Sequence, residues 1–450
     1  MRWLAISAAV VLLALWMAAV AESSRLTLSA FLYTAAPEYD LQAWVKGGER
    51  FPQGAQILVH DSAAERPLAS DFFASADPSV SFDGKRVLFS GKRKAQDPWE
   101  IWELSLADHS VKKIVADSNG CVRPLYLPDD RIVYSRKLNG HFVIQAGSPG
   151  KSEALGLTYA AGNSLPLDIL HDGRVLFESE YPMGNGRASE LYTVYSDGSG
   201  VESYRCDHGP SRHSGRQVAS GDIVLVSGQR LARFTSSLAH EIKVPAPVGE
   251  YAGDVAELPD NRWLVAWRVD NSRFFEVRSW DARSGELRRV VQSKHTNLIQ
   301  PVLVAPRPIP NRHPSALHHW KYANLLCLSA YTSKYAFAAD SLATVRAYTQ
   351  DESGHPKLLG AARIERDGSF YLRVPADQPL QLELLDSAGN SVKKEEGWFW
   401  MRRGEQRICV GCHAGPEVAP ENAVPTVLLR STIAADLTGD MAGSANGGQQ

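Results

Sequence analysis

The stretch that decides the fold is Asp77–Phe89, which reads DPSVSFDGKRVLF. A Pro-containing lead is followed by an Asp-Gly turn signal and then by an apolar run typical of a β-strand. Related stretches recur at Arg123–Tyr134, Leu165–Phe177, Ser220–Leu225 and Leu258–Val265, and a degenerate copy begins at Gln300. The period of about 40–50 residues matches one four-stranded blade of a β-propeller. Six copies predict a six-bladed propeller.

The repeats also suggest how the ring closes. The strand Ala55–Val59 precedes the first full copy, and we expect it to pair with the last blade, which would remove exposed sheet edges. Asp-Gly, Asp-Asp and Asp-Asn pairs stand where tight hairpin turns need a positive φ. The pattern Asp-Pro-Ser-x-Ser-x-Asp-Gly resembles the repeats of TolB-type propellers. That resemblance implies a fold and no particular function.

A second, smaller domain follows the stiff Pro-rich connector Pro306–Pro314. Short alternating or apolar runs separated by turn signals predict a small β-sandwich. The expected strands are 342–348, 361–364, 369–374, 380–385 and 392–400. From residue 431 to 450 the chain is dominated by small and polar residues, and we expect a disordered tail.

The chemistry-bearing motif of this domain is Cys409-Val410-Gly411-Cys412-His413, the C-x-x-C-H pattern of c-type haem attachment. The two thiols can add to the two vinyl groups of one haem, and the adjacent imidazole can ligate the iron. The alternatives are a redox-active Cys pair, half of a zinc site, or a chance match. The chain shows neither the βαβ context of the first nor a second ligand pair for the second.

The N-terminus and the charge balance indicate the compartment and the partners. Arg2 precedes the apolar run Leu4–Met17, and Ala19-Val20-Ala21 offers a small-x-small cleavage site. We therefore expect residues 1–21 to be a secretory signal peptide, the mature chain to be periplasmic or secreted, and no integral membrane segment to remain after cleavage. The net charge is −2, which argues against nucleic acid as a partner.

Several further residues are candidate metal ligands. Cys327 lies near the pair His318-His319, but adjacent His residues on a strand point to opposite faces and rarely share one ion. A buried Cys and a surface His pair explain the same residues without a metal. Met401, His313, His318 and His319 are the candidates for the haem ligand opposite His413.

The motifs of the C-terminal third resemble the hydrazine synthase alpha-subunit family. The resemblance is carried by Leu-Cys-Leu-x-x-Tyr at 326–331, Asp-Gly-Ser-Phe at 367–370, residues 397–405, the motif at 409–413, and Ala-Pro-Glu-Asn at 419–422. It implies a six-bladed propeller followed by a middle domain that binds one c-type haem. It further implies that Cys409 and Cys412 are the thioether anchors, that His413 is the axial ligand, and that Cys327 lies near the haem and holds an additional metal.

The chain also departs from that family. The resemblance implies a Tyr shortly after C-x-x-C-H that approaches the haem, and a further haem-binding domain. Here no Tyr follows Tyr371, and the chain contains one C-x-x-C-H motif. These departures argue against hydrazine synthesis itself, and a related haem protein is the expectation.

These observations predict an exported monohaem c-type protein that transfers electrons or performs redox chemistry on small molecules. Its partner would be a redox protein or a small-molecule substrate, and a haem-dependent oxidoreductase activity is left open. The alternative is a propeller scaffold that binds a partner within a redox complex. The expected division is a signal peptide at 1–21, the propeller at 22–310, the haem domain at 311–430 and the tail at 431–450.

Overall fold

The computed structural model describes residues 30–61, 65–151, 153–159, 162–183, 186–205, 211–269, 272–351, 353–395, 397–412, 418 and 422–439. The expected signal peptide and the last part of the expected tail lie outside these ranges. So do Cys206 and His413. Neither helix formed by the described residues is long and apolar enough to cross a membrane.

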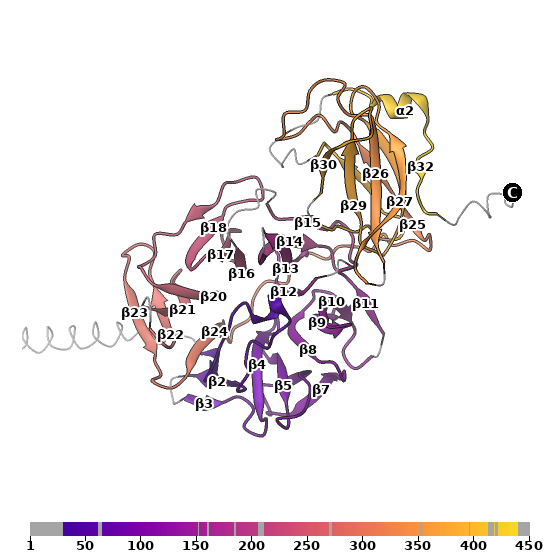
Figure 1. Cartoon of the computed structure of the whole chain (residues 1–450). Coiled ribbons are helices and arrows are strands. Elements are labelled where there is room, and N and C mark those ends of the chain that lie inside the picture. Colours follow the sequence, from indigo (N-terminus) through magenta and orange to yellow (C-terminus); the bar gives the residue numbers. More distant parts are fainter. Residues whose placement is uncertain are drawn as a thin grey trace, which may run out of the picture.

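The described part of residues 31–303 forms six four-stranded antiparallel sheets around a common centre, as Figure 1 shows. This confirms the prediction of an all-β propeller. The first five sheets are β4–β7 (Ala74–Val80, Arg86–Lys92, Glu100–Ser105, Val111–Val115), β8–β11 (Cys121–Tyr126, Ile132–Leu138, His141–Gly147, Ala154–Gly156), β12–β15 (Ser164–Ile169, Val175–Met183, Gly186–Val194, Glu202–Ser203), β16–β19 (Arg212–Gln217, Ile223–Ser227, Arg230–Phe234, Ile242–Lys243) and β20–β23 (Glu250–Glu257, Trp263–Arg268, Glu276–Trp280, Leu287–Val291).

The sixth sheet joins the two ends of the propeller. Its strand order is β24 (Asn297–Leu303), β1 (Phe31–Ala36), β2 (Gln56–His60) and β3 (Glu65–Pro67). The strand near residue 57 joins the last sheet, as predicted, but it does not pair with β24 directly: β1 pairs with β24, and β2 pairs with β1 and β3. An N-terminal strand not expected from the repeats therefore makes the closing contact.

The Pro-containing leads of the repeats are themselves strands. Asp77 lies in β4 and Arg123 in β8, each the first strand of its sheet, and the predicted turns follow them. The first strand of each sheet, and likewise β24, has a register shift at a bulge. These strands lie at a sheet edge, where a Pro that cannot donate a backbone hydrogen bond is tolerated. The expected positive φ in the hairpin turns is confirmed, for example at Gly84 and Asp130.

Several residues at these bulges have buried polar or charged side chains, which interact with one another inside the ring. Asp77, Arg123, Ser214, Asp254 and Gln300 all have a positive φ at their bulge. Arg123 binds Asp254 through two hydrogen bonds of 3.1 and 3.2 Å. Burial alone would raise the pKa of Asp77, but the guanidinium of Arg50 holds that pKa well below its usual range. Pairs from different sheets therefore tie the ring together electrostatically.

A hydrophobic cluster lies beside this network. The 3₁₀-helix η1 (Ala43–Lys46) places Trp44, which is 1% exposed, against small and aliphatic side chains of the first strands, including Ala74 and Ala252. Small side chains at these positions leave room for the indole, which fills the middle of the ring. The segment between β1 and β2 thus packs into the propeller.

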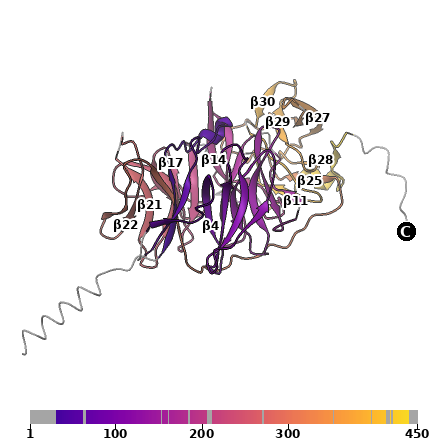
Figure 2. The same ribbon diagram turned by 90° about the horizontal axis from the view of Figure 1, so that it is seen from below.

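The C-terminal domain is the predicted β-sandwich. One sheet has the order β31 (Gln406–Cys409), β25 (Tyr322–Cys327), β28 (Phe370–Pro375) and β32 (Ala435–Asp436), and the other has β27 (Pro356–Arg363), β26 (Thr344–Gln350), β29 (Gln381–Leu385) and β30 (Ser391–Lys394). Figures 1 and 2 show this domain beside one side of the ring. Its core includes Leu325, Val345, Phe370 and Met401.

Two boundaries of this domain differ from the prediction. The expected strand 392–400 stops at Lys394, and only an isolated bridge joins Phe399 to Leu380. Residues 431–439 are not a disordered tail, because β32 pairs in parallel with β28 and Leu437 is buried in the sandwich core. The short helix α2 (Thr426–Arg430) precedes this strand.

A substitution in the buried pair of Arg123 and Asp254 tests whether the network of buried charges stabilises the propeller. Asp254→Asn keeps the side-chain shape and tolerates the positive φ, but it removes the carboxylate that Arg123 and Arg216 share and leaves Arg123 with only Asp77, at 3.9 Å. We expect the free energy of unfolding in urea to fall by about 3 kcal/mol. The matched control is Glu286→Gln, which removes a solvent-exposed partner of Arg288 and should leave the unfolding midpoint unchanged. Equal effects of the two substitutions would contradict the role of the network.

Candidate functional site

The cysteine motif reaches its position through a parallel strand pair. In the register of β31 with β25, Cys409 stands opposite Cys327. The backbone N–H of Leu328 donates to the carbonyl oxygen of Cys409 at 2.9 Å and extends this pairing by one residue. β25 is in turn held by β28, where Phe370 stands opposite Cys327. The motif therefore begins where an edge strand of the sandwich ends.

Three cysteines gather at this point. Cys327 is 1% exposed and belongs to the sandwich core, while Cys409 and Cys412 are half-buried against the same core. A hydrogen bond between the thiols of Cys327 and Cys412, together with burial, raises the pKa of Cys327 well above its usual value. Burial raises the pKa of Cys409 to about 11. All the cysteines within the described ranges are free thiols, and the pKa shifts keep Cys327 and Cys409 protonated at neutral pH.

The turn between the two motif cysteines is packed against a neighbouring loop. A Cβ on Gly411 would lie 2.7 Å from the carbonyl oxygen of Ser329 and would collide with that of Thr332. The N–H of Ser329 also donates to the carbonyl oxygen of Val410 at 3.3 Å. Only glycine lets the two backbones approach this closely. The packing of the turn therefore explains why a glycine stands at position 411 of the motif.

The Asp-Gly-Ser-Phe stretch at 367–370 forms hydrogen bonds with the loop at 329–332. The hydroxyl of Ser329 donates to the carbonyl oxygen of Asp367 at 2.6 Å, and the N–H of Ala330 donates to that of Gly368 at 2.8 Å. The carboxylate of Asp367 accepts from the N–H of Thr426 at 2.6 Å at the start of α2. The chain before and after the motif is therefore fastened to one turn.

The segment before β31 fixes the sandwich to the propeller. Trp400 is 3% exposed, packs in a cluster with side chains of β8–β15 such as Phe177, and donates from its indole nitrogen to the carbonyl oxygen of Gly198 at 3.1 Å. Arg402 donates to the carbonyl oxygen of Gly156 at 2.9 Å. This segment therefore serves the interface between the domains, with Trp400 in the propeller-side cluster rather than in the sandwich core.

The other candidate ligands lie in different places. Met401 is fully buried in the same core cluster as Cys327. His318 and His319 are exposed and lie against each other, with ring centroids 4.1 Å apart and ring planes tilted by 36°. His313 stacks on Tyr195 of the propeller at 3.7 Å. His413 falls outside the described residues, so its position opposite any of these is not described.

The geometry also bears on the expected metal at Cys327. Within the described ranges, no three His, Cys, Asp or Glu side chains are arranged to hold a common ion. A metal ion at Cys327 would therefore need a ligand from another part of the chain, such as His413. The three thiols are close together and pack against the sandwich core, and the raised pKa values of Cys327 and Cys409 keep these two from being thiolate ligands at neutral pH.

The fold and the motif define a class of protein: a β-propeller joined to a β-sandwich that carries a C-x-x-C-H sequence next to a third cysteine. A family model described as the hydrazine synthase alpha subunit middle domain matches residues 329–414. The chain is related to the hydrazine synthase alpha-subunit family. The matched region contains the whole of the motif and the loop on which Gly411 packs.

Individual proteins of similar sequence or fold are also found. The hydrazine synthase subunit alpha of Kuenenia stuttgartiensis is 27% identical over 77 residues, which are 17% of this chain and 10% of that protein. The match thus spans about a tenth of the length of the curated relative. The solved structure of Kuenenia stuttgartiensis hydrazine synthase has a TM-score of 0.77 at 17% identity, over 89% of this chain and 71% of that chain, which shows a shared fold. TolB from Acinetobacter baumannii has a TM-score of 0.47 at 15% identity, over 62% of this chain and 67% of that chain.

The close approach at Gly411 yields a prediction. Gly411→Ala forces the motif turn away from the loop at 329–332, and we expect the free energy of unfolding to fall by about 1–3 kcal/mol. Gly397→Ala is the matched control, because a Cβ at Gly397 meets nothing within 4 Å. Urea denaturation followed by tryptophan fluorescence compares the two. The packing of the turn would be disproved by a Gly411→Ala protein as stable as Gly397→Ala.

Proposed function

We propose that this chain is an exported c-type haem protein that carries one haem on Cys409 and Cys412, with His413 as an axial ligand of the iron. The observation that carries the proposal is the placement of the C-x-x-C-H motif at the end of an edge strand, with both motif thiols half-buried and therefore reachable from outside. Cys327, in contrast, is closed inside the core. The two motif thiols are therefore available for haem attachment, whereas the thiol of Cys327 is not.

An exposed apolar side chain stands next to the proposed attachment site. Ile408 is 65% exposed and directly precedes the first motif cysteine. A haem or a partner protein that covers this side chain would remove apolar area from water.

The residues of this chain have distinct tasks in the proposal. Cys409 and Cys412 anchor the group, and Gly411 holds the turn that spaces them. Asp367 and Ser329 hold the loop beneath that turn. A bound haem supplies a one-electron iron couple, whose potential the protein tunes through the axial ligand, burial and hydrogen bonds.

The proposed architecture, compartment and partner are supported by the sheet arrangement, the N-terminal sequence and the relation to the hydrazine synthase alpha-subunit family. The six four-stranded sheets are taken as the blades of a six-bladed propeller, and the N-terminal apolar run as a signal that exports the chain to the periplasm. The curated relative is named as a subunit, which supports a role for this chain beside a protein partner in electron transfer or redox chemistry. The missing downstream Tyr argues against hydrazine synthesis as its own activity.

Covalent haem can be measured directly. The full chain, exported in cells with a c-type haem maturation system, should show haem staining on a denaturing gel and one haem per chain by pyridine haemochrome absorbance. Replacing both Cys409 and Cys412 by Ala should abolish the covalent signal, since each thioether bond is formed by one of these two thiols. Cys327→Ala, in the same thiol cluster, should retain it.

Two results would overturn the proposal. One is wild-type protein without covalent haem, in which case the propeller acts as a scaffold that binds a partner. The other is a double Cys409→Ala, Cys412→Ala protein that still carries covalent haem.

A further inference from the structure

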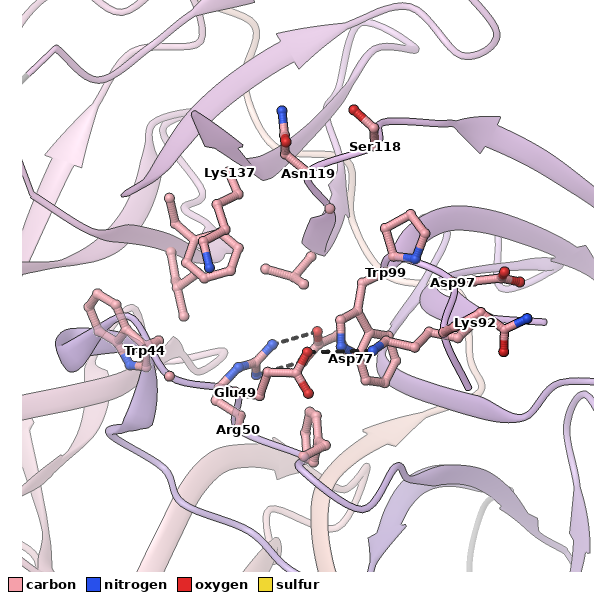
Figure 3. A pocket seen from close by; sticks show the side chains of 18 of the residues that line it. Trp44, Glu49, Arg50, Asp77, Lys92, Asp97, Trp99, Ser118, Asn119 and Lys137 are labelled. Atoms are coloured by element: carbon pink, nitrogen blue, oxygen red, sulfur yellow. Dashed lines mark hydrogen bonds and ion pairs between the residues drawn. The ribbon is translucent and has the colours of Figure 1, made fainter. Parts of the chain in front are cut away.

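A cavity of about 330 Å³ lies in the propeller, in a different domain from the cysteine motif. It is bounded by the segment around η1 and by the sheets β4–β7 and β8–β11. Figure 3 shows Arg50 in its middle, with Trp44 and Lys137 on one side and Trp99 on the other. The volume is within the range of small-molecule sites in proteins.

The base of the cavity is a buried ion pair with unused donors. The guanidinium of Arg50 gives two hydrogen bonds to the carboxylate of Asp77, at 2.8 and 2.7 Å. Gln300 and Ser90 each give that carboxylate one more, both at 2.8 Å, so its oxygens are well supplied. A guanidinium has five N–H donors, and those of Arg50 have no other side-chain acceptor within the described part of the chain.

Two further donors border the same space. Trp44 is 1% exposed, and its indole N–H finds no acceptor within the described ranges. Lys137 forms no ion pair with any described carboxylate, and its ammonium lies 5.7 Å from the ring centroid of Phe142. An indole and an ammonium can only donate, so what satisfies them must bring acceptor oxygens. A buried donor without a partner costs free energy, which favours a ligand that supplies one.

The carboxylates around the cavity do not supply these acceptors. Glu49 lies 3.4 Å from the ammonium of Lys92, which also lies over the ring of Trp99 at 5.0 Å. Asp97 accepts the backbone N–H of Lys94 at 2.9 Å. Asp77 and Glu49 are already matched by Arg50 and Lys92. Lys137 and Asp97 are the lining charges left without an ion pair among the described residues. The N–H donors of Arg50, Trp44 and Lys137 that lack an acceptor therefore outnumber the one carboxylate that is not ion-paired.

The remaining walls are aromatic. Phe51, Trp99 and Phe142 line the cavity together with Trp44. Aromatic faces bury flat or apolar groups well, while the donors at the base and side fix the position of a charged end.

We propose that this cavity binds a small organic carboxylate with a flat or apolar body. The carboxylate is received by Arg50, Lys137 and the indole N–H of Trp44, and the body lies among Phe51, Trp99 and Phe142. The site is separate from the haem proposal, since it uses residues of the propeller only.

The test uses a pair of probes of nearly equal shape. Phenylacetate carries the carboxylate, and phenylacetamide replaces it by a neutral amide. Binding to the full chain is followed by isothermal titration calorimetry, with acetate as the probe that lacks the apolar body. We expect phenylacetate to bind at least about tenfold more tightly than either of the other two, because a charge-assisted hydrogen bond is lost with the amide and the aromatic contact is lost with acetate.

Variants locate the site. Lys137→Gln, which keeps a polar side chain but removes the charge, and Trp44→Phe, which keeps an aromatic ring but removes the indole N–H, should each weaken phenylacetate binding, the first by about tenfold. Lys243→Gln removes an exposed charge from the strand β19, away from the cavity lining, and should bind as the wild type does. Absence of phenylacetate binding, equal binding of the amide, or unchanged binding by Lys137→Gln would each overturn the proposal. Covalent haem content should be the same in all these variants, so this result is independent of the haem test.

Discussion

The parallel pairing of β31 with β25 is the interaction on which the candidate site depends. It brings Cys409 level with Cys327 and leaves Cys412 at hydrogen-bonding distance from the Cys327 thiol. Without this pair the motif would be a loop at the end of a domain, and no third thiol would be near it. The backbone contact at Gly411 completes the arrangement, because it fixes the turn between the two motif cysteines against the neighbouring loop.

The propeller in turn fixes where this arrangement stands. Trp400 and Arg402, a few residues before β31, bind carbonyl oxygens of Gly198 and Gly156 in the propeller. A strand that begins immediately after such an anchor has little freedom in direction or register. The sandwich that carries the motif therefore stands at one side of the ring, as Figure 2 shows.

Turns and strands could be predicted from the sequence where they depend on residues that are close together in the chain. The Asp-Gly and Asp-Asp turns, the all-β propeller and the sandwich follow from alternation and turn residues, as at Gly84 and Asp130. The leads of the repeats were misjudged, since Pro is usually read as a strand breaker, and only their position at a sheet edge makes these segments strands. The closing strand β1 carries no repeat signature of its own. Its role follows from pairing with β24, far along the chain.

The site was predictable in its residues and not in its contacts. Cys409 and Cys412 stand out by spacing alone, whereas the meeting of Cys327 with Cys412 depends on a strand pair between distant segments. The role of Trp400 was missed for the same reason, because an aromatic residue in a strand-like run is equally compatible with a domain core and with an interface. Local sequence patterns determine where strands and turns form, whereas pairing between distant strands determines which side chains come into contact.

The most direct test of this arrangement is the reactivity of the three thiols in the haem-free chain. The native protein is treated with iodoacetamide, and peptide mass spectrometry identifies the cysteines that are alkylated. The structure predicts that the half-buried Cys409 and Cys412 are modified first, and that Cys327, which is 1% exposed, reacts only after denaturation in urea. A native chain in which Cys327 is alkylated as fast as the two motif cysteines would contradict the account.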